Sequence, residues 1–319
     1  MLENTTLTPQ EVADMLKIAK NTVYELIKRG ELNGYKVGKK IRVDLKDVEN
    51  YKNKTKHTTK NQSSNVKEND LSSPDIFYPT KNDPNGGFII CGQDVLLDIL
   101  SRYIEIRCPG TRTFRSYVGS YSGLLSLYMG KIQVATAHLW DGDSNEYNIP
   151  FVRRLLPGIP TVIIHLAWRM QGFYVSKGNH KGIQSFEDLK RPDIVLANRE
   201  RGCGTRILLD EHLRLLKINS ASIKGYTKEY FSHLEVASAV ARGEADIGLG
   251  NEKTSLQVTN VDFIPIQKER YDLVMKKEDI NKPPFNSILE ILRSNQFQSE
   301  ILGIGGYDIT QMGNIIAEL

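Results

Sequence analysis

The chain has 319 residues, 40% of them apolar and 25% charged, with 42 Lys and Arg against 38 Asp and Glu, a formal charge of +4. This length predicts two domains, and no apolar run reaches the ~18 residues of a membrane-spanning helix. The three cysteines are too few for a disulfide framework and lack the spacing of metal ligands. Together with the polar N-terminus, they favour a cytoplasmic location for the protein.

The positive charge is concentrated near the N-terminus. Residues 1–60 hold 13 basic and 8 acidic side chains, whereas the rest of the chain is close to balance. This asymmetry indicates a contact with nucleic acid, although a solvated basic face would give the same pattern.

The first fifty residues predict two short helices joined by a tight turn. Thr8 can cap the first helix and Glu11 completes a capping box, and a second helix is expected over residues 20–29. In a helix-turn-helix the second helix enters the major groove of DNA. A basic hairpin over residues 35–43 and a third helix over 45–51 follow. The side chains expected to contact DNA are Lys20, Asn21, Thr22, Tyr24, Lys28, Lys36, Lys39, Lys40 and Arg42.

A characteristic pattern runs through these segments, over Leu7–Ala13, Thr22–Leu32, Lys36–Lys39 and Asp47–Val48. It resembles the excisionase-type winged helix-turn-helix domain, which implies sequence-specific binding of duplex DNA. One departure is Ala19, where such domains usually have a serine that caps the second helix. The missing cap should lower the free energy of unfolding of this domain by about 1 kcal/mol.

A change in composition separates this domain from the rest. Residues 53–86 are rich in Lys, Asn, Thr, Ser, Asp and Pro and poor in apolar residues, so we expect a flexible linker there. The linker would join a DNA-binding domain of residues 1–52 to a body of residues 87–319. In the body, apolar strand-like runs alternate with helical ones, which predicts an α/β fold long enough for two lobes with a ligand cleft.

The expected strands of the body begin at or near Phe88, Arg115, Val134, Thr161, Ile194, Ile223, Asp246 and Phe263. The strand from Thr161 to Ser176 is expected to break at Gln171–Gly172, where glycine interrupts the β-rich run.

Three turns of the body lead into helices, at residues 119–123, 202–206 and 232–234. The first backbone N–H groups of a helix lack internal partners and lie at the positive end of its dipole, so helix starts favour anions. Capping alone could explain each turn singly, but the three together indicate an oxyanion site. The candidate ligand-binding residues are Ser120, Tyr121, Ser122, Cys203, Gly204, Thr205, Arg206 and His233.

The body carries a further series of motifs, Gly119–Leu124, Ala137–Asp141, Arg169–Gly172, Asn198–Asp210, Gly225–Tyr226, Gly243–Gly248 and Gly306–Asp308. In order and spacing they resemble the periplasmic-binding-protein-like domain of cytoplasmic regulators that respond to molybdate or tungstate. The resemblance implies a two-lobe, type 2 periplasmic-binding-protein fold with an oxyanion between the lobes. Cys203 departs from the serine usual in that family. A helix N-terminus should lower the pKa of its thiol, and a thiolate would repel a dianion.

We therefore expect a cytoplasmic one-component transcriptional regulator that binds duplex DNA, as a homodimer, and senses molybdate or tungstate. It would need no cofactor or metal and would not associate with a membrane. A different effector, such as an organic acid or another anion, stays open because a fold does not fix its ligand.

An enzyme is not expected, because the sequence has no metal cluster, nucleophile elbow or Walker loop. His138 with Asp141, and His165, are the suggestive polar groups, and core or hinge roles are expected for them.

Overall fold

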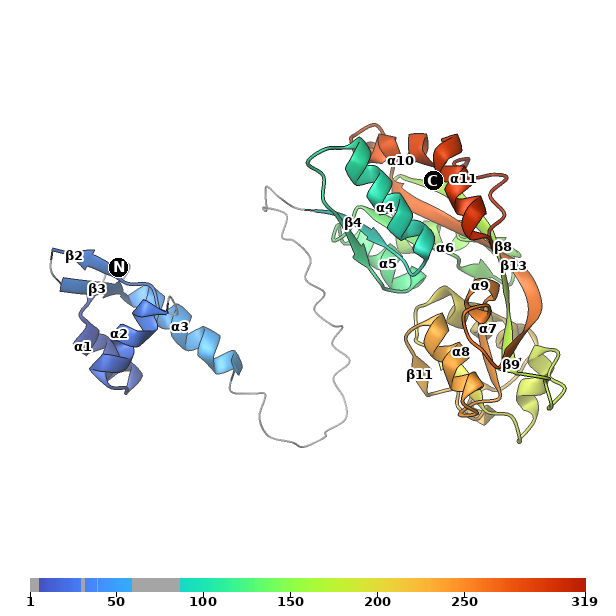
Figure 1. Cartoon of the computed structure of the whole chain (residues 1–319), viewed down its shortest axis with the longest axis horizontal. Helices are drawn as coiled ribbons and strands as arrows, with labels where there is room; N and C mark the ends of the chain where they lie inside the picture. The colour runs from blue at the N-terminus through green and yellow to red at the C-terminus, as the bar shows by residue number, and fades with distance from the viewer. Residues whose placement is uncertain (1–5, 30–31, 39, 59–86) are drawn as a thin grey trace. The chain divides into compact units, whose positions relative to one another are not determined.

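A computed structural model describes residues 6–29, 32–38, 40–58 and 87–319. The chain divides into two compact units, Met1–Pro74 and Asp75–Leu319 (Figure 1). Most of the expected linker, residues 59–86, lies outside the described residues. Within the described ranges, no helix combines the length and the apolar character needed to cross a membrane.

The first unit contains, among its described residues, β1 (Thr6–Leu7), α1 (Pro9–Leu16), α2 (Lys20–Lys28), β2 (Tyr35–Val37), β3 (Lys40–Asp44) and α3 (Leu45–Thr58). The capping box is confirmed: the backbone N–H of Glu11 donates to Thr8 Oγ1 over 3.3 Å, and that of Thr8 donates to Glu11 Oε2 over 2.7 Å. Ala19 caps α2 without a side-chain hydrogen bond. Helix α3 continues to Thr58, beyond the end at residue 51 that the sequence predicted for it.

The second unit is built around two long antiparallel strands. β9 (Thr161–Ser176) and β13 (Val261–Lys276) pair along their lengths and pass from one lobe into the other (Figure 1). The expected break at Gln171–Gly172 was wrong, because these residues pair with β12 (Ile247–Asn251) as well as with β13. Two strands that cross together form the hinge between the lobes.

We call residues 87–165 and 272–319 lobe A, and residues 172–265 lobe B. Lobe A contains β4 (Phe88–Cys91), α4 (Val95–Arg107), β5 (Thr113–Ser116), α5 (Ser120–Tyr128), β6 (Val134–Ala137), β7 (Trp140–Asp141), β8 (Glu146–Tyr147), α6 (Ile149–Leu155), α10 (Phe285–Leu292), α11 (Asn295–Ile304) and β14 (Ile315–Glu318). Lobe B contains β10 (Leu196–Arg199), α7 (Gly204–Leu215), β11 (Glu229–Tyr230), α8 (His233–Ala241), β12 and α9 (Glu252–Ser255).

One sheet runs through both lobes in the order β11-β10-β12-β9-β13-β6-β4-β5, with β14 on β9. β4 lies parallel to β5 and β6, and β10 lies parallel to β11 and β12. Helices α4, α5, α7 and α8 each follow one of these parallel strands, so their N-termini lie at carboxyl ends of strands, where α/β folds bind ligands.

Two details of the body differ from expectation. The strand expected near Ile223 was wrong: the region holds a 3-10 turn, Ser220–Ser222, and a single bridge at Lys224, and the strand is β11. Helix α5 begins at Ser120, inside the turn expected over residues 119–123, with Gly119 as its N-cap. Glycine offers no side-chain cap, so the sequence gives little sign of this helix start.

Candidate functional site

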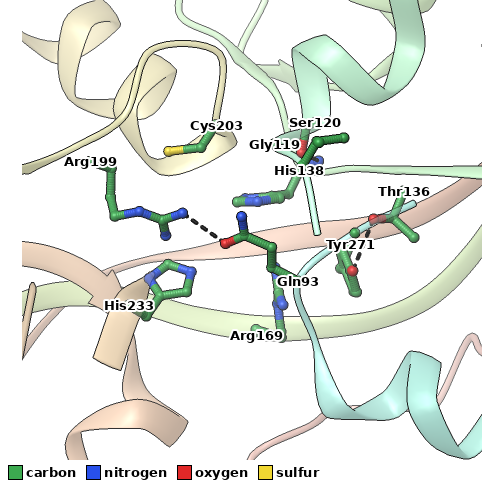
Figure 2. A pocket seen from close by; sticks show the side chains of 12 residues that line it. Gln93, Gly119, Ser120, Thr136, His138, Arg169, Arg199, Cys203, His233 and Tyr271 are labelled. Carbon is green, nitrogen blue, oxygen red and sulfur yellow. Dashed lines mark hydrogen bonds between the residues drawn. The ribbon is translucent and has the colours of Figure 1, made fainter. Parts of the chain in front are cut away.

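A small cavity lies between lobes A and B. Its volume is about 20 Å³, which suits a compact ligand and not an extended one. Lobe A contributes Gly92, Gln93, Val118, Gly119, Ser120, Thr136 and His138, lobe B contributes Arg199, Cys203 and His233, and the crossing strands contribute Arg169 and Tyr271 (Figure 2).

Four helices begin at this cavity, two from each lobe. Gln93 immediately precedes the N-cap of α4, and Gly119 is the N-cap of α5. Cys203 is the N-cap of α7, and His233 is the first residue of α8. The positive ends of four helix dipoles therefore lie around one small space, which stabilises negative charge there.

Arg169 lies buried on the crossing strand β9 and is held by two carboxylates. Its Nη1 lies 2.6 Å from Asp94 Oδ2 and its Nη2 lies 2.5 Å from Glu269 Oε1. Its guanidinium also stacks 3.8 Å above the ring of Tyr271. Glu269 Oε2 lies 2.7 Å from His138 Nδ1. Burial favours the neutral form of Glu269, but Arg169 and His138 outweigh burial and lower the pKa of the carboxyl, so Glu269 stays ionised.

Arg199 provides the second buried guanidinium. Its Nη2 donates to Gln93 Oε1 over 2.8 Å, which joins lobe B to lobe A (Figure 2). Its Nε donates to Glu200 Oε2 over 2.7 Å. Within the described part of the chain, its Nη1 makes no hydrogen bond. The guanidinium is therefore held in place with donor capacity left for a ligand.

His233 is buried, and its Nδ1 has no hydrogen-bond partner among the described residues. Burial, and then Arg199, Arg169 and His138, hold the pKa of His233 well below its ordinary value, so the ring is neutral. A neutral imidazole carries one N–H donor and one acceptor. A buried nitrogen without a hydrogen-bond partner raises the free energy of the folded protein. A ligand in the cavity that hydrogen-bonds to this nitrogen would remove that cost.

Cys203 corrects an expectation. Burial raises the pKa of its thiol to about 12 and outweighs the opposing effect of Arg199, so the thiol stays protonated and does not repel an anion. Its Sγ accepts a hydrogen bond from the backbone N–H of Arg206 over 3.3 Å and so caps α7.

The two lobes are in direct contact beside the cavity. The backbone N–H of Tyr121 in lobe A donates to the carbonyl oxygen of Gly202 in lobe B over 2.9 Å. A Cβ on Gly204 would lie 2.6 Å from ring atoms of His138, so only glycine fits at this contact. This is the closed arrangement of a two-lobe body.

In the first unit, most of the side chains expected to contact DNA are exposed. On α2, Lys20, Asn21, Thr22, Tyr24 and Lys28 point away from the core, and on the hairpin Lys36 and Lys40 are exposed and Arg42 is half-buried. Lys39 lies outside the described residues.

Two family models match the chain. A helix-turn-helix domain model matches residues 6–56, and a PBP superfamily domain model matches residues 101–293. The chain belongs to the PBP superfamily. The combination is that of a DNA-binding regulator with a ligand-binding domain.

Two curated relatives of this PBP superfamily member are uncharacterized proteins. YvgK of Bacillus subtilis (strain 168) is 39% identical over 318 residues, which is 100% of both chains. A protein from the ferredoxin 2Fe-2S gene 5' region of Clostridium pasteurianum is 60% identical over 113 residues, which is 35% of this chain and 100% of that one.

Solved structures share the fold of the PBP superfamily body. One is a Clostridium perfringens protein assigned as the substrate-binding protein of a phosphate ABC transporter, with bound phosphate. It is 14% identical, covers 69% of this chain and 98% of its own, and has a TM-score of 0.52. A mutant of Corynebacterium glutamicum OxyR is 13% identical, covers 93% of this chain and 88% of its own, and has a TM-score of 0.51. At these identities the likeness concerns the fold alone.

The structure brings three of the eight candidate ligand residues to the cavity of the PBP superfamily body, namely Ser120, Cys203 and His233. Tyr121, Ser122, Gly204, Thr205 and Arg206 do not line it. Arg206 instead binds Asp210 over 3.1 Å and donates to the carbonyl of Arg199 over 3.1 Å, so it fixes the turn rather than facing the space.

Sequence reasoning did not assign Arg169, Arg199 or Gln93 to the site. Arg169 and Arg199 lie within motifs that were recognised, and Gln93 follows the strand expected from Phe88, but nothing local reveals that these side chains face a cleft. His138 lines the cavity, whereas His165 is fully buried and pairs with Asp272 over 3.0 Å. Among the described residues, no group of three or more His, Cys, Asp or Glu side chains is placed to hold a metal ion.

Proposed function

We propose that this protein is a one-component transcriptional regulator whose lobes close on a small oxyanion, with molybdate or tungstate as the effector. The observation that carries the proposal is the cavity itself. Four helix N-termini and two arginine side chains meet there, and the buried Nδ1 of His233 lacks a partner among the described residues. In the closed form these donors are fixed and enclosed, which stabilises an anion between the lobes.

The chemistry of the lining favours a fully ionised anion. None of the described residues that line the cavity is Asp or Glu, and the hydroxyl, thiol and guanidinium groups there can all donate. Phosphate and other anions that carry a proton find few acceptors for it, whereas molybdate and tungstate carry none at neutral pH. The small volume also disfavours extended ligands.

An organic acid is the second candidate. The specific observation in its favour is the pair of buried guanidinium groups, Arg169 and Arg199, because arginine binds carboxylates through two parallel hydrogen bonds.

Calorimetric titration of the full chain tests the effector. Tungstate, molybdate, sulfate, phosphate and oxalate, a compact dicarboxylate, would each be titrated into the wild type, Arg199→Met and Arg154→Met. Arg154 is the matched control, an exposed arginine on α6. We expect tungstate and molybdate to bind at least 100-fold more tightly than phosphate, and Arg199→Met alone to weaken them at least tenfold. Binding of oxalate only would establish the organic-acid candidate, and binding of none would refute both.

Regulation would follow from closure. An effector that binds the closed lobes better shifts the population toward them, and the closed form of a homodimer would present its two helix-turn-helix units at a different spacing. To test this, duplex sites selected by the full chain from a random pool would be titrated with and without tungstate, with fluorescence anisotropy as the readout. An inverted repeat bound with a tungstate-dependent affinity is expected. Equal affinity in both conditions would contradict the coupling.

A further inference from the structure

A groove adjoins the anion cavity and is much larger. Its volume is about 500 Å³, against about 20 Å³ for the cavity. This lies within the range of small-molecule sites. Gln93 and His233 line both spaces, so the groove meets the cavity at these two side chains.

Both lobes contribute exposed apolar side chains to the walls of this groove. Val95 and Tyr117 of lobe A are 43% and 62% exposed, and Phe231 and Leu234 of lobe B are 67% and 51% exposed. Single exposed apolar residues are ordinary, but four that line one concave space indicate a binding site. Because one aromatic ring comes from each lobe, a ligand between them would contact both lobes.

The two aromatic residues are tied to the cavity through their backbones. Gln93 Nε2 donates to the carbonyl oxygen of Tyr117 over 2.9 Å, and Arg199 Nη2 approaches the carbonyl oxygen of Phe231 at 3.5 Å. The Gln93 and Arg199 side chains in turn bind each other over 2.8 Å. The positions of the two rings therefore depend on the same interlobe hydrogen bond that closes the cavity.

The carboxylates in the groove are already paired, and its lysine is hydrogen-bonded to the backbone. Asp94 binds Arg169 over 2.6 Å and Asp98 pairs with Arg115. Lys253 donates to the carbonyl oxygen of Gly305 over 2.8 Å. Neither carboxylate is left to pair with a cationic ligand. The Lys253 ammonium has no carboxylate partner among the described residues, but two backbone carbonyl oxygens and the Tyr307 ring already engage it, so the walls favour a neutral ligand.

A polar group remains for orientation. The side-chain amide of Gln257, which lines the groove, makes no hydrogen bond to any described residue. It can donate to, or accept from, the edge of a planar ring.

We propose that this groove is a second effector site, for a flat, uncharged aromatic molecule that stacks on Tyr117 and Phe231 and hydrogen-bonds to Gln257. The site rests on the closure assumed in the proposed function. A ligand that contacts both lobes favours the closed form, so it strengthens oxyanion binding. By linkage the oxyanion strengthens binding of the aromatic molecule by the same factor.

The test uses N-phenyl-1-naphthylamine, a neutral aromatic dye whose fluorescence rises in apolar surroundings, titrated into the full chain. We expect saturable binding that Tyr117→Ser and Phe231→Ser each weaken at least tenfold. Ile106→Ser is the control, because Ile106 is 66% exposed on α4 and does not line the groove. Saturating tungstate should lower the Kd of the dye at least fivefold, and saturating dye should lower the Kd of tungstate by the same factor.

Dye affinity that neither groove variant changes, or that Ile106→Ser changes equally, would overturn the site. Dye affinity independent of tungstate, in a protein that binds both, would overturn the coupling. If tungstate does not bind the wild type, the proposed effector fails, while the comparison of the groove variants with Ile106→Ser still decides whether the aromatic site exists.

Discussion

Gly119 offers a direct perturbation of lobe closure. A Cβ at this position would lie 2.6 Å from the Cα of Cys203, 2.7 Å from the carbonyl oxygen of Gly202 and 2.8 Å from the backbone nitrogen of Cys203. All three are backbone atoms of the opposite lobe, so they move only if the lobes separate. The φ of Gly119 is −67°, which alanine also adopts, so Gly119→Ala introduces no backbone strain within lobe A.

Overpacking by one methyl group typically costs about 1–3 kcal/mol. If the closed form bears this whole cost, tungstate should bind Gly119→Ala roughly 5- to 150-fold more weakly, at 1.4 kcal/mol for each tenfold change. Calorimetric titration of the full chain measures the reduced affinity, and thermal unfolding without ligand should stay near the wild-type value. Gly303→Ala is the control, because a Cβ there meets nothing within 4 Å. Wild-type tungstate affinity in Gly119→Ala would refute the claim that closure creates the site.

Three further predictions concern the helix-turn-helix unit and the cavity. The double substitution Lys36→Ala and Lys40→Ala should weaken DNA binding. It should also make the plot of the logarithm of the DNA-binding constant against the logarithm of salt concentration less steep, by about 0.9 for each DNA phosphate that a lysine no longer neutralises. An unchanged slope would show that the hairpin does not follow the phosphate backbone. Ala19→Ser should add the missing N-cap of α2 and raise the free energy of unfolding of this unit by about 1 kcal/mol in urea titration, whereas no gain would mean that the turn cannot present a hydroxyl. The Cys203 thiol has a pKa of about 12 and therefore stays protonated at pH 8. Iodoacetamide at that pH should alkylate the half-buried Cys108 faster than Cys203, which peptide mass spectrometry would detect. Preferential alkylation of Cys203 would contradict its burial.

Local signals were enough for much of the N-terminal unit. Thr8 and Glu11 lie three residues apart and satisfy each other, so the start of α1 follows from sequence. The end of α3 does not, because the Lys- and Asn-rich stretch after Tyr51 has neither an apolar stripe nor a stop signal, yet the helix continues to Thr58.

In the body, the missed features depend on tertiary contacts. Gln171–Gly172 looks like a break until both neighbouring strands pair with it. Burial decides the protonation of Cys203 against the local effect of its helix N-terminus. Arg169 becomes part of the cavity only because Asp94 and Glu269, distant in sequence, converge on it. Periodicity and turn chemistry could not reveal these convergences.

The most direct test of the account is a crystal structure of the full chain grown with tungstate, with anomalous scattering recorded at the tungsten absorption edge. The account predicts one strong anomalous peak per chain, in the cavity between Arg169, Arg199 and His233. A peak elsewhere, or closed lobes with no tungsten in the cavity, would contradict it.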